Sequence, residues 1–263
     1  MRLEENGSAV EGGLDDLSVV VPTYNERENV EPLLRGLDAV RREWGRGFEV
    51  LVVDDRSPDG TAAAFERLAP RLGVPVRVVE RDGPRSLGRA IVEGIRLSRG
   101  DLVCVMDADL SHPPQLVSRL LAALDGADGA VASRYAPGGR ISRWPLSRRL
   151  VSWGATALAR VLTQDRCRDP VSGFFLFRRA SLAGLTLTGI GDKPLVEILA
   201  QRPLAIHEVP YEFRDRQHGR SKLNAGGIAR FARLVVRLST GAGRTQTPEV
   251  GVRVGMERGT REL

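Results

Sequence analysis

The sequence has few cysteines and no long apolar run. Its 263 residues include 2 cysteines, Cys104 in an apolar stretch and Cys167 in a polar one. They provide neither a disulfide framework nor a metal-binding spacing, so we expect a reducing compartment. No uninterrupted apolar stretch approaches the about 18 residues that indicate a membrane span. The N-terminal residues also lack the basic start and apolar run of a secretion signal. We therefore expect a cytoplasmic protein that is neither secreted nor membrane-spanning.

Two common phosphate-binding motifs and an obvious catalytic triad are also missing. No G-x-G-x-x-G follows an apolar run, and no G-x-x-x-x-G-K-[ST] occurs anywhere. The three histidines, His112, His207 and His218, are each isolated in the sequence. A bound nucleotide would therefore have to be held by carboxylates, an aromatic ring and a metal ion.

Positive charge is abundant and unevenly placed. The formal net charge is +6. Residues 134–168 contain eight arginines against one acidic residue, and residues 214–237 contain seven Arg or Lys against one. This pattern indicates an anionic partner, and nucleic acid, anionic lipid and phosphorylated substrates all agree with it.

Apolar runs and helical patterns alternate between residues 17 and 240, which we expect to form one domain. Short apolar runs bounded by turn residues predict strands at 17–21, 48–53, 76–79 and 102–106. Helical spacing of apolar residues follows each of them. Alternation of this kind predicts an α/β fold with a mostly parallel sheet flanked by helices on both faces. Residues 1–16 and 241–263 show no periodicity, and we expect them to be disordered tails.

Polar clusters follow three of the predicted strands, where ligands of such sheets bind. Any one cluster alone is more often explained by ordinary caps and turns; Asn29, for example, is placed to cap the first helix. Their recurrence at three strand ends indicates a site. The clusters are Pro22 with Tyr24 and Glu26, Asp54 with Asp55, and Asp107 with Asp109.

Asp107 and Asp109 are the strongest candidates for metal ligands. Strand side chains alternate, so a strand through residue 109 would point both carboxylates to one side and Ala108 away. Two close carboxylates repel unless a cation lies between them, and hard oxygen ligands suit Mg²⁺ or Mn²⁺. The alternative is a pair of solvated acids that cap the next helix.

Seven segments together resemble the inverting family 2 glycosyltransferases with the GT-A fold, and within them the polyprenol (dolichol) phosphate mannose synthases. No single segment is as specific as the ordered set, which spans about residues 17–238. The segments are 21–26, 53–61, 106–112, 133–135, 144–154, 169–174 and 215–222.

The resemblance implies roles for particular residues. Pro22, Tyr24, Glu26, Val53 and Asp55 would hold the guanosine end of GDP-mannose. Asp107, Ala108 and Asp109 would hold the metal ion and the diphosphate, while Arg134, Arg216 and Lys222 would contact donor or acceptor phosphates. Arg148 and Ser152 match positions implied for the acceptor phosphate. One departure concerns the metal, because Ser111 stands where some relatives carry a glutamine ligand.

The implied reaction transfers mannose from GDP-mannose to a polyprenyl monophosphate with inversion and with Mg²⁺ or Mn²⁺ as cofactor. A phosphate monoester is already anionic at neutral pH, so the nucleophile needs little help from a general base. The implied partners are the polyprenyl phosphate lipid, a membrane surface and, in one arrangement, a small membrane-anchoring protein, without nucleic acid. The alternatives are a UDP-sugar transferase acting on polyprenyl phosphate or a small acceptor, and a non-catalytic module that binds phosphate or lipid.

Residues 225–238 have the pattern of an amphipathic helix. Helical spacing places five apolar residues on one side and three arginines beside them. We expect the apolar side to lie on the cytoplasmic face of a membrane, so that a peripherally bound enzyme reaches its lipid. The alternative is an ordinary helix whose apolar face packs on the core. The apolar residues are Ile228, Phe231, Leu234, Val235 and Leu238, and the arginines are Arg230, Arg233 and Arg237.

Overall fold

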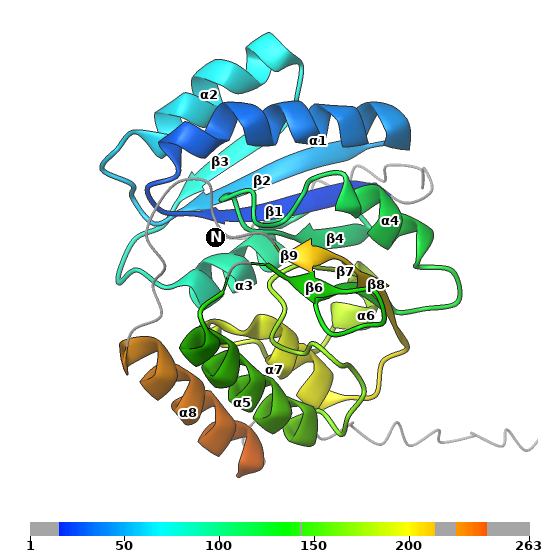
Figure 1. Ribbon diagram of the computed structural model, residues 1–263. Coiled ribbons are helices and arrows are strands. Elements are labelled where there is room, and N and C mark those ends of the chain that lie inside the picture. The colour runs from blue at the N-terminus through cyan, green and yellow to red at the C-terminus, as the bar shows by residue number, and fades with distance from the viewer. Residues whose placement is uncertain (1–15, 143, 214–224, 241–263) are drawn as a thin grey trace, which may run out of the picture.

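The computed structural model describes residues 16–142, 144–213 and 225–240. Within these residues, seven strands form one sheet in the order β3-β2-β1-β4-β7-β5-β8 (Figure 1). Neighbouring strands are parallel except that β7 runs antiparallel to both β4 and β5. The strands are β1 Leu17–Thr23, β2 Phe48–Asp54, β3 Val76–Glu80, β4 Leu102–Val105, β5 Gly129–Ser133, β7 Phe175–Arg178 and β8 Ile206–Pro210. The mixed, mostly parallel sheet confirms the predicted fold class, while the predicted tails lie outside the described residues, apart from Asp16.

The central strands are continuous apolar runs because both faces of the sheet are covered. Every residue of β1, β4 and β5 is buried. All four predicted strands are present, with ends within two residues of those expected. Two short parallel strands, β6 (Arg140–Ile141) and β9 (Glu212–Phe213), form a separate small sheet.

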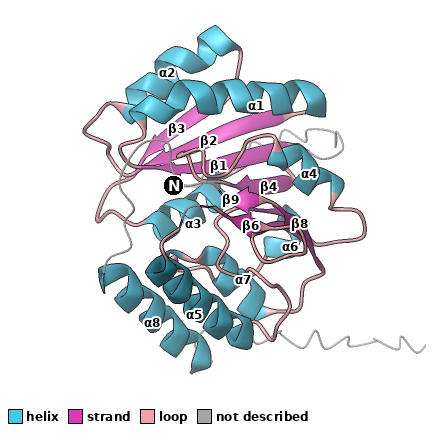
Figure 2. Cartoon of the chain, viewed as in Figure 1, coloured by secondary structure: helices cyan, strands magenta, loops and turns pink. Residues whose placement is uncertain are grey.

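Helices cover the sheet in two layers, which Figure 2 shows by secondary structure. On one face, Leu33 and Leu37 of α1, Phe65 of α2 and Leu120 of α4 pack in one core cluster. On the other face, Ile91 of α3 packs with α7 in a second cluster. The helices are α1 Val30–Trp44, α2 Thr61–Leu72, α3 Leu87–Leu97, α4 Leu116–Ala122, α5 Leu146–Leu162, α6 Arg179–Leu182, α7 Pro194–Gln201 and α8 Ala225–Ser239, with short 3₁₀ turns η1 Arg27–Asn29 and η2 Ile190–Asp192.

Helices α5 and α8 lie against each other outside α7 (Figure 1). The helical prediction for 225–238 is correct, but the predicted orientation of its apolar side is wrong for most of its residues. Leu234 is fully buried, and Phe231 and Leu238 pack beside it in a third cluster with Val196 of α7. Only Ile228 of the five predicted lipid-facing residues is strongly exposed, at 55%. The apolar pattern of α8 therefore serves mainly to attach the helix to the domain.

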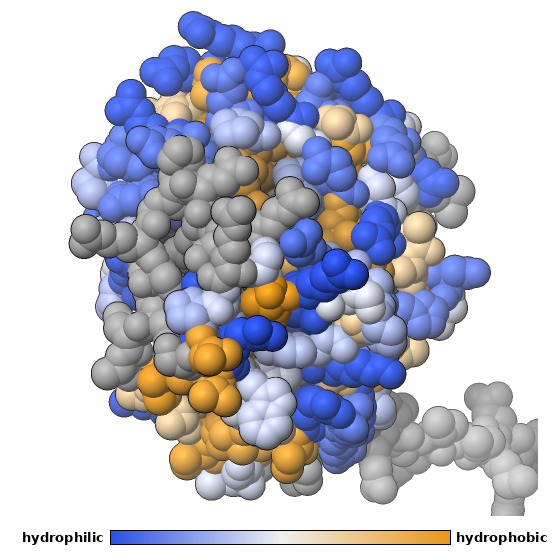
Figure 3. Space-filling model, in the orientation of Figure 1, coloured by the Kyte–Doolittle hydropathy of each residue, from blue (hydrophilic) through white to orange (hydrophobic). Residues whose placement is uncertain are grey.

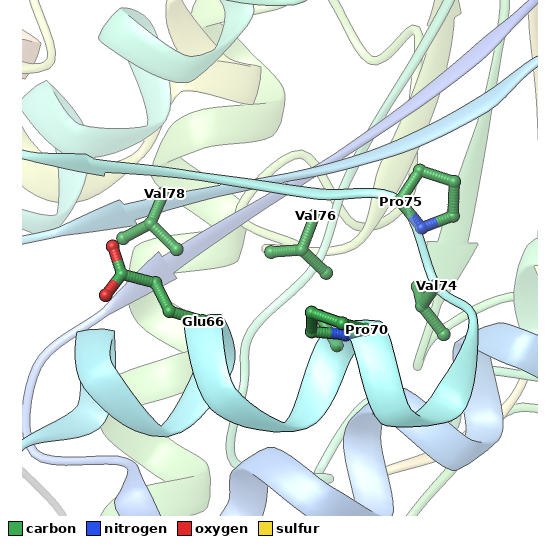
Figure 4. Close-up of a pocket in the computed structure, with 7 residues that line it drawn as sticks. Glu66, Pro70, Val74, Pro75, Val76 and Val78 are labelled. Carbon is green, nitrogen blue, oxygen red and sulfur yellow. The ribbon is translucent and has the colours of Figure 1, made fainter.

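A pocket at the β3 edge of the sheet has no chemistry that suits catalysis. It lies between α2 and β3, and Figure 4 shows its apolar lining, with Glu66 as the charged side chain. Val76 and Val78 line it from the strand and Pro70 from the helix. The polar strand ends of the sheet are not part of this lining.

Candidate active site

The three polar clusters meet at one edge of the sheet, as predicted. Strand β1 pairs in parallel with both β2 and β4, so the carboxyl ends of the three strands are neighbours. Pro22 lies opposite Val53 in this register. The Asp55 N–H donates to the Thr23 carbonyl at 3.1 Å, and the Met106 N–H donates to the Val20 carbonyl at 3.1 Å. Backbone hydrogen bonds therefore continue from the sheet to Asp55 and to Met106, the residue before Asp107.

The loop after β1 presents Tyr24 and Glu26. The guanidinium carbon of Arg85 lies 3.8 Å from the centre of the Tyr24 ring, which is a close cation–π contact. The Glu26 backbone N–H donates to Thr61 Oγ1 at 2.9 Å, and its Oε2 accepts from Asn29 Nδ2 at 2.7 Å. Asn29 stands at the N-cap of α1, as predicted, but its side chain makes no capping hydrogen bond, because its amide donates to Glu26 instead.

The paired acids after β2 have different environments. Asp54 is fully buried and accepts hydrogen bonds from Thr23 Oγ1 at 2.6 Å and from the Ser57 N–H at 2.6 Å, so it holds the turn. Asp55 forms an ion pair with Arg81, and its Oδ2 accepts from the Ser86 N–H at 2.8 Å. The carboxylate predicted to read the nucleobase is thus also the anchor of the 81–86 loop.

Asp107 and Asp109 lie beyond the end of β4. The predicted strand alternation does not reach them, because β4 ends at Val105 and Ala108 is buried together with Asp109. The Asp107 side chain is 27% exposed, whereas Asp109 is 3% exposed as a residue. Asp109 Oδ1 accepts from the Ser111 N–H at 3.0 Å and from the Ser111 hydroxyl at 2.6 Å. Ser111 therefore orients Asp109 by donating to it.

His112 supports the two aspartates from a buried position. Its Nδ1 accepts the Asp107 N–H at 3.0 Å, and its ring stacks on Phe174 with 5.0 Å between centroids. Burial lowers the pKa of His112, although the charges of Asp107 and Asp109 act in the opposite direction. With Nδ1 as acceptor, the neutral ring carries its proton on Nε2. His112 therefore fixes the backbone of the aspartate segment.

The two aspartates suit a hard divalent cation that shares a diphosphate. Among the described residues no group of three or more His, Cys, Asp or Glu is arranged as a metal cluster. Mg²⁺, however, is usually held by only one or two carboxylates together with substrate phosphates and water. The donor set of Asp107 and Asp109 meets that requirement. The Ser111 hydroxyl donates its proton to Asp109 and keeps its oxygen lone pairs, so it remains a weak neutral ligand at most.

Arg134 is paired with a buried carboxylate. Its Nε and Nη2 donate to the two carboxylate oxygens of Asp169, each at 2.7 Å, and Asp169 is fully buried. Burial acts against the guanidinium charge, yet the hydrogen bonds from Arg134 to Asp169 raise the pKa of Arg134. This pairing joins the end of β5 to the 169–173 segment through Nε and Nη2 of Arg134. The contact of Arg134 with a substrate phosphate stays a prediction.

Arg148 and Ser152 lie one turn apart on α5. The guanidinium carbon of Arg148 is 4.0 Å from the centre of the Trp144 ring, and Ser152 Oγ lies 3.3 Å from the Tyr135 hydroxyl. The buried Trp144 Nε1–H has no hydrogen-bond partner among the described residues. Arg216 and Lys222, the other two predicted phosphate ligands, lie outside the described residues.

Several charged residues of the site were missed by the sequence analysis. Arg81 and Arg85 come from the loop that covers Asp55 and Tyr24. Asp169 lies in the 169–174 segment, one of the seven that resemble the family, so the sequence did contain a signal for this residue. Lys193 lies outside every such segment, and no sequence pattern singles it out.

Comparison with known proteins identifies the family. Residues 18–185 match the model of Glycosyl transferase family 2. This chain belongs to that family. Its fold and its strand-end carboxylates are those expected of a glycosyltransferase, and the chain is an enzyme of this class.

Several relatives of this glycosyltransferase are named mannosyltransferases. It is 41% identical over 226 residues to dolichol-phosphate mannosyltransferase of Pyrococcus furiosus, covering 84% of this chain and 63% of that one. The chain thus spans less than two thirds of that relative. Dolichol-phosphate mannosyltransferase of Saccharomyces cerevisiae is 37% identical over 82% of this chain and 84% of its own length. Polyprenol monophosphomannose synthase of Mycolicibacterium smegmatis is 39% identical over 80% and 82%.

Solved structures with low sequence identity share the GT-A fold of this family 2 member. Mannosyl-3-phosphoglycerate synthase from Rubrobacter xylanophilus aligns with a TM-score of 0.59 at 21% identity over 90% of this chain and 78% of its own. A mannosyltransferase from Pyrobaculum calidifontis, solved with GDP-Man and Mn²⁺, aligns with a TM-score of 0.57 at 21% identity over 87% and 64%. At these identities the likeness establishes the fold only.

Proposed function

We propose that this chain transfers mannose from GDP-mannose to a polyprenyl monophosphate, with inversion at the anomeric carbon. The observation that carries the proposal is the meeting of Tyr24, Asp55 and Asp107 at adjacent strand ends, in a chain 36–41% identical to relatives named as mannosyltransferases of dolichol, polyprenol or undecaprenyl phosphates.

The donor half of the proposed site is formed by the ends of β1, β2 and β4. Asp55 keeps acceptor capacity beyond Arg81 and Ser86, since a carboxylate offers about four lone-pair sites. Pro22, Val53 and Glu26 line the same edge. Asp107 and Asp109 would hold Mg²⁺ or Mn²⁺, which would offset the charge of the leaving diphosphate.

The acceptor half of the proposed site is formed by α5 and the residues before it. Arg148 presents a planar fork that matches phosphate, and Trp144 holds that fork by cation–π contact. The unsatisfied Trp144 Nε1–H adds a donor close by. The acceptor phosphate is itself the nucleophile, and the buried His112, whose Nδ1 already accepts a hydrogen bond, is not needed as a base.

We further propose that α5 and the adjoining side of α8 meet the bilayer that contains the acceptor. No described helix is long and apolar enough to cross a membrane. Figure 3 shows hydrophobic residues gathered on the part of the surface where α5 and α8 lie. An exposed apolar patch of this kind marks an interaction surface. Its members are Leu146, Leu150, Val151, Trp153, Leu158 and Val161 of α5 with Ile228 and Val236 of α8.

Basic residues accompany this surface, as expected for an anionic leaflet. Arg149 and Arg233 are exposed on the same two helices. Arg148 and Ser152 lie on α5 itself, so a lipid whose chain lies in the bilayer would bring its phosphate to them. A lipid surface alone, or a lipid surface with a small anchoring protein, would satisfy this arrangement.

A transfer assay tests the proposal directly. Purified full-length chain is incubated with polyprenyl phosphate, Mg²⁺ and a panel of radiolabelled GDP-mannose, UDP-glucose and UDP-N-acetylglucosamine. We expect label in the lipid phase from GDP-mannose only, and a product that is acid-labile and of inverted configuration. Transfer from a UDP-sugar instead would overturn the donor assignment, and transfer to a water-soluble acceptor would overturn the lipid acceptor.

A further inference from the structure

Lys193 places an ammonium group among the charged residues of the site. It stands at the N-cap of α7, directly after the η2 turn. Its Nζ donates to the Val171 carbonyl at 3.0 Å. Val171 belongs to the 169–173 segment, whose Gly173 is so close to the metal-ligand candidate that an added Cβ would lie 3.5 Å from Asp107 Oδ2. Lys193 therefore contacts the segment that lies beside Asp107.

The carboxylates around Lys193 are already used by other cations. Asp169 is held at both oxygens by Arg134. Asp192 accepts from Arg230 of α8 at 2.8 Å and from the Gly88 N–H at 3.0 Å. Among the residues that the structure describes, none places a carboxylate oxygen within 4.0 Å of Lys193 Nζ, and the neutral Val171 carbonyl is its hydrogen-bond partner.

This charge is costly in the protein without a ligand. Burial is the main influence that lowers the pKa of Lys193, and the positive charge of Arg134 lowers it further. The negative charges of Asp107, Asp169 and Asp192 act in the opposite direction and raise this pKa. Taking an ammonium out of water without an anionic partner is unfavourable. Lys193 as a residue is half-buried, and the neighbouring Asp107 side chain is 27% exposed, so the region beside Asp107 is open to a ligand. An anionic group that binds beside Asp107 would compensate the charge.

We propose that Lys193 binds a phosphate oxygen of a substrate, as an addition to the residues that the strand ends supply. The inference rests on the proposed function, since the substrates there carry a diphosphate on the donor and a monophosphate on the acceptor. Either group presents the same chemistry to Nζ. The competing explanation is that Lys193 only positions the 169–173 segment through Val171.

Three substitutions separate these explanations. Lys193→Met removes charge and donor, Lys193→Gln keeps an N–H donor without charge, and Lys193→Arg keeps the charge. Full-length chain in Mg²⁺ is titrated calorimetrically with GDP, UDP and inorganic diphosphate, and the KM for polyprenyl phosphate is measured separately. Arg42→Met, which removes an exposed arginine on α1, is the matched control.

If Lys193 binds phosphate, Lys193→Met and Lys193→Gln should each weaken the binding of either the donor or the acceptor by about 10-fold or more, as expected for the loss of a hydrogen bond to a charged group. Lys193→Arg should retain part of that binding. A loss confined to the diphosphate titrations assigns Lys193 to the donor, and a loss confined to the lipid KM assigns it to the acceptor. The melting temperature of Lys193→Met should be equal to or above that of the wild type, because an uncompensated charge is removed.

Unchanged affinities in all three variants would overturn the proposal. A second result would also overturn it: Lys193→Gln binds the ligands normally while Lys193→Met has a lowered melting temperature. That result would mean that Lys193 only positions the 169–173 segment through its hydrogen bond to Val171. The titrations do not depend on mannose transfer. If the wild type binds UDP and not GDP, the proposed donor fails, while the comparison of Lys193 variants on UDP still decides this inference.

Discussion

Arg134 and Asp169 form a two-point ion pair that joins β5 to the segment before β7. Both guanidinium-to-carboxylate distances are 2.7 Å, and the Arg134 backbone N–H adds a third hydrogen bond to Asp169 at 3.0 Å. The pair lies beside Tyr211, whose pKa is raised by burial. Because β7 is inserted between β4 and β5, this link sets the position of the 169–173 segment next to Asp107.

Breaking this pair should destabilise the fold. Arg134→Ala and Asp169→Asn are each expected to lower the free energy of unfolding by about 3–5 kcal/mol, because each leaves an uncompensated buried partner. Urea unfolding measures the free energy of unfolding. The double variant should lose less stability than the sum of the losses of the two single variants. Glu31→Gln, in an exposed pair with Arg35, should change stability by no more than about 1 kcal/mol. Losses for Arg134→Ala as small as this control would contradict the structural role.

Asp107→Asn and Asp109→Asn should reduce turnover while the fold is kept. Loss of one anionic ligand opposite a diphosphate is expected to lower kcat by about 10²–10³. The Asn at 109 can still accept the Ser111 hydrogen bonds. Binding of Mn²⁺ in the presence of GDP should weaken in parallel, measured by calorimetry. Asp101→Asn, an exposed carboxylate at the start of β4, is the control. Near-normal turnover of both site variants would remove the metal assignment.

Arg148→Ala should weaken binding of the acceptor and leave donor binding unchanged. The KM for polyprenyl phosphate in detergent is expected to rise about 10-fold or more, with partial recovery in Arg148→Lys, since an ammonium lacks the planar fork. Trp144→Leu should have a smaller effect of the same kind, because it removes the ring under the guanidinium. Arg149→Ala, its exposed neighbour, should behave like the wild type. An equal rise for Arg149→Ala would mean that general positive charge suffices.

Membrane binding should depend on α5 more than on the buried side of α8. Leu150 and Trp153 are 69% and 66% exposed, so Leu150→Glu with Trp153→Glu should release the protein from anionic vesicles without unfolding it. Flotation in a density gradient measures release, and circular dichroism checks the fold. Leu234→Glu should instead detach α8 from the domain, because Leu234 is fully buried. Undiminished flotation of the α5 double variant would exclude this surface.

The stability of the domain should fall in acid partly through Asp128. Hydrogen bonds from the Ala205 N–H and the Ser181 hydroxyl lower the pKa of Asp128 below its usual value. A lowered folded-state pKa stabilises the fold fully above the unfolded-state pKa of about 3.9, and this contribution is lost as the pH falls from there through the lower folded-state pKa. Asp128→Asn should therefore be less stable than the wild type at pH 7, with the difference shrinking toward about pH 3. Asp125→Asn, which changes an exposed carboxylate nearby, is the control.

The sequence by itself determined the elements and the first half of the site. Continuous apolar runs identify strands buried on both faces, and the alternation with helices makes the sheet mostly parallel. In a parallel sheet the residues after each strand necessarily share one edge, so Tyr24, Asp55 and Asp107 could be grouped from local information alone. The motif order then supplied the family.

Only the tertiary structure decided what β7 and α8 bring together. An antiparallel strand between β4 and β5 is a non-local pairing, and it is this pairing that sets Asp169 against Arg134. The hydrogen bond from Lys193 to the Val171 carbonyl is likewise a contact between residues far apart in the sequence. For α8, a helical stripe of apolar residues has the same pattern whether it faces lipid or core, because periodicity records a buried face and not the material that buries it. Leu234 lies against Gly191 because the η2 turn leaves room there, and no sequence pattern within residues 225–238 contains that information.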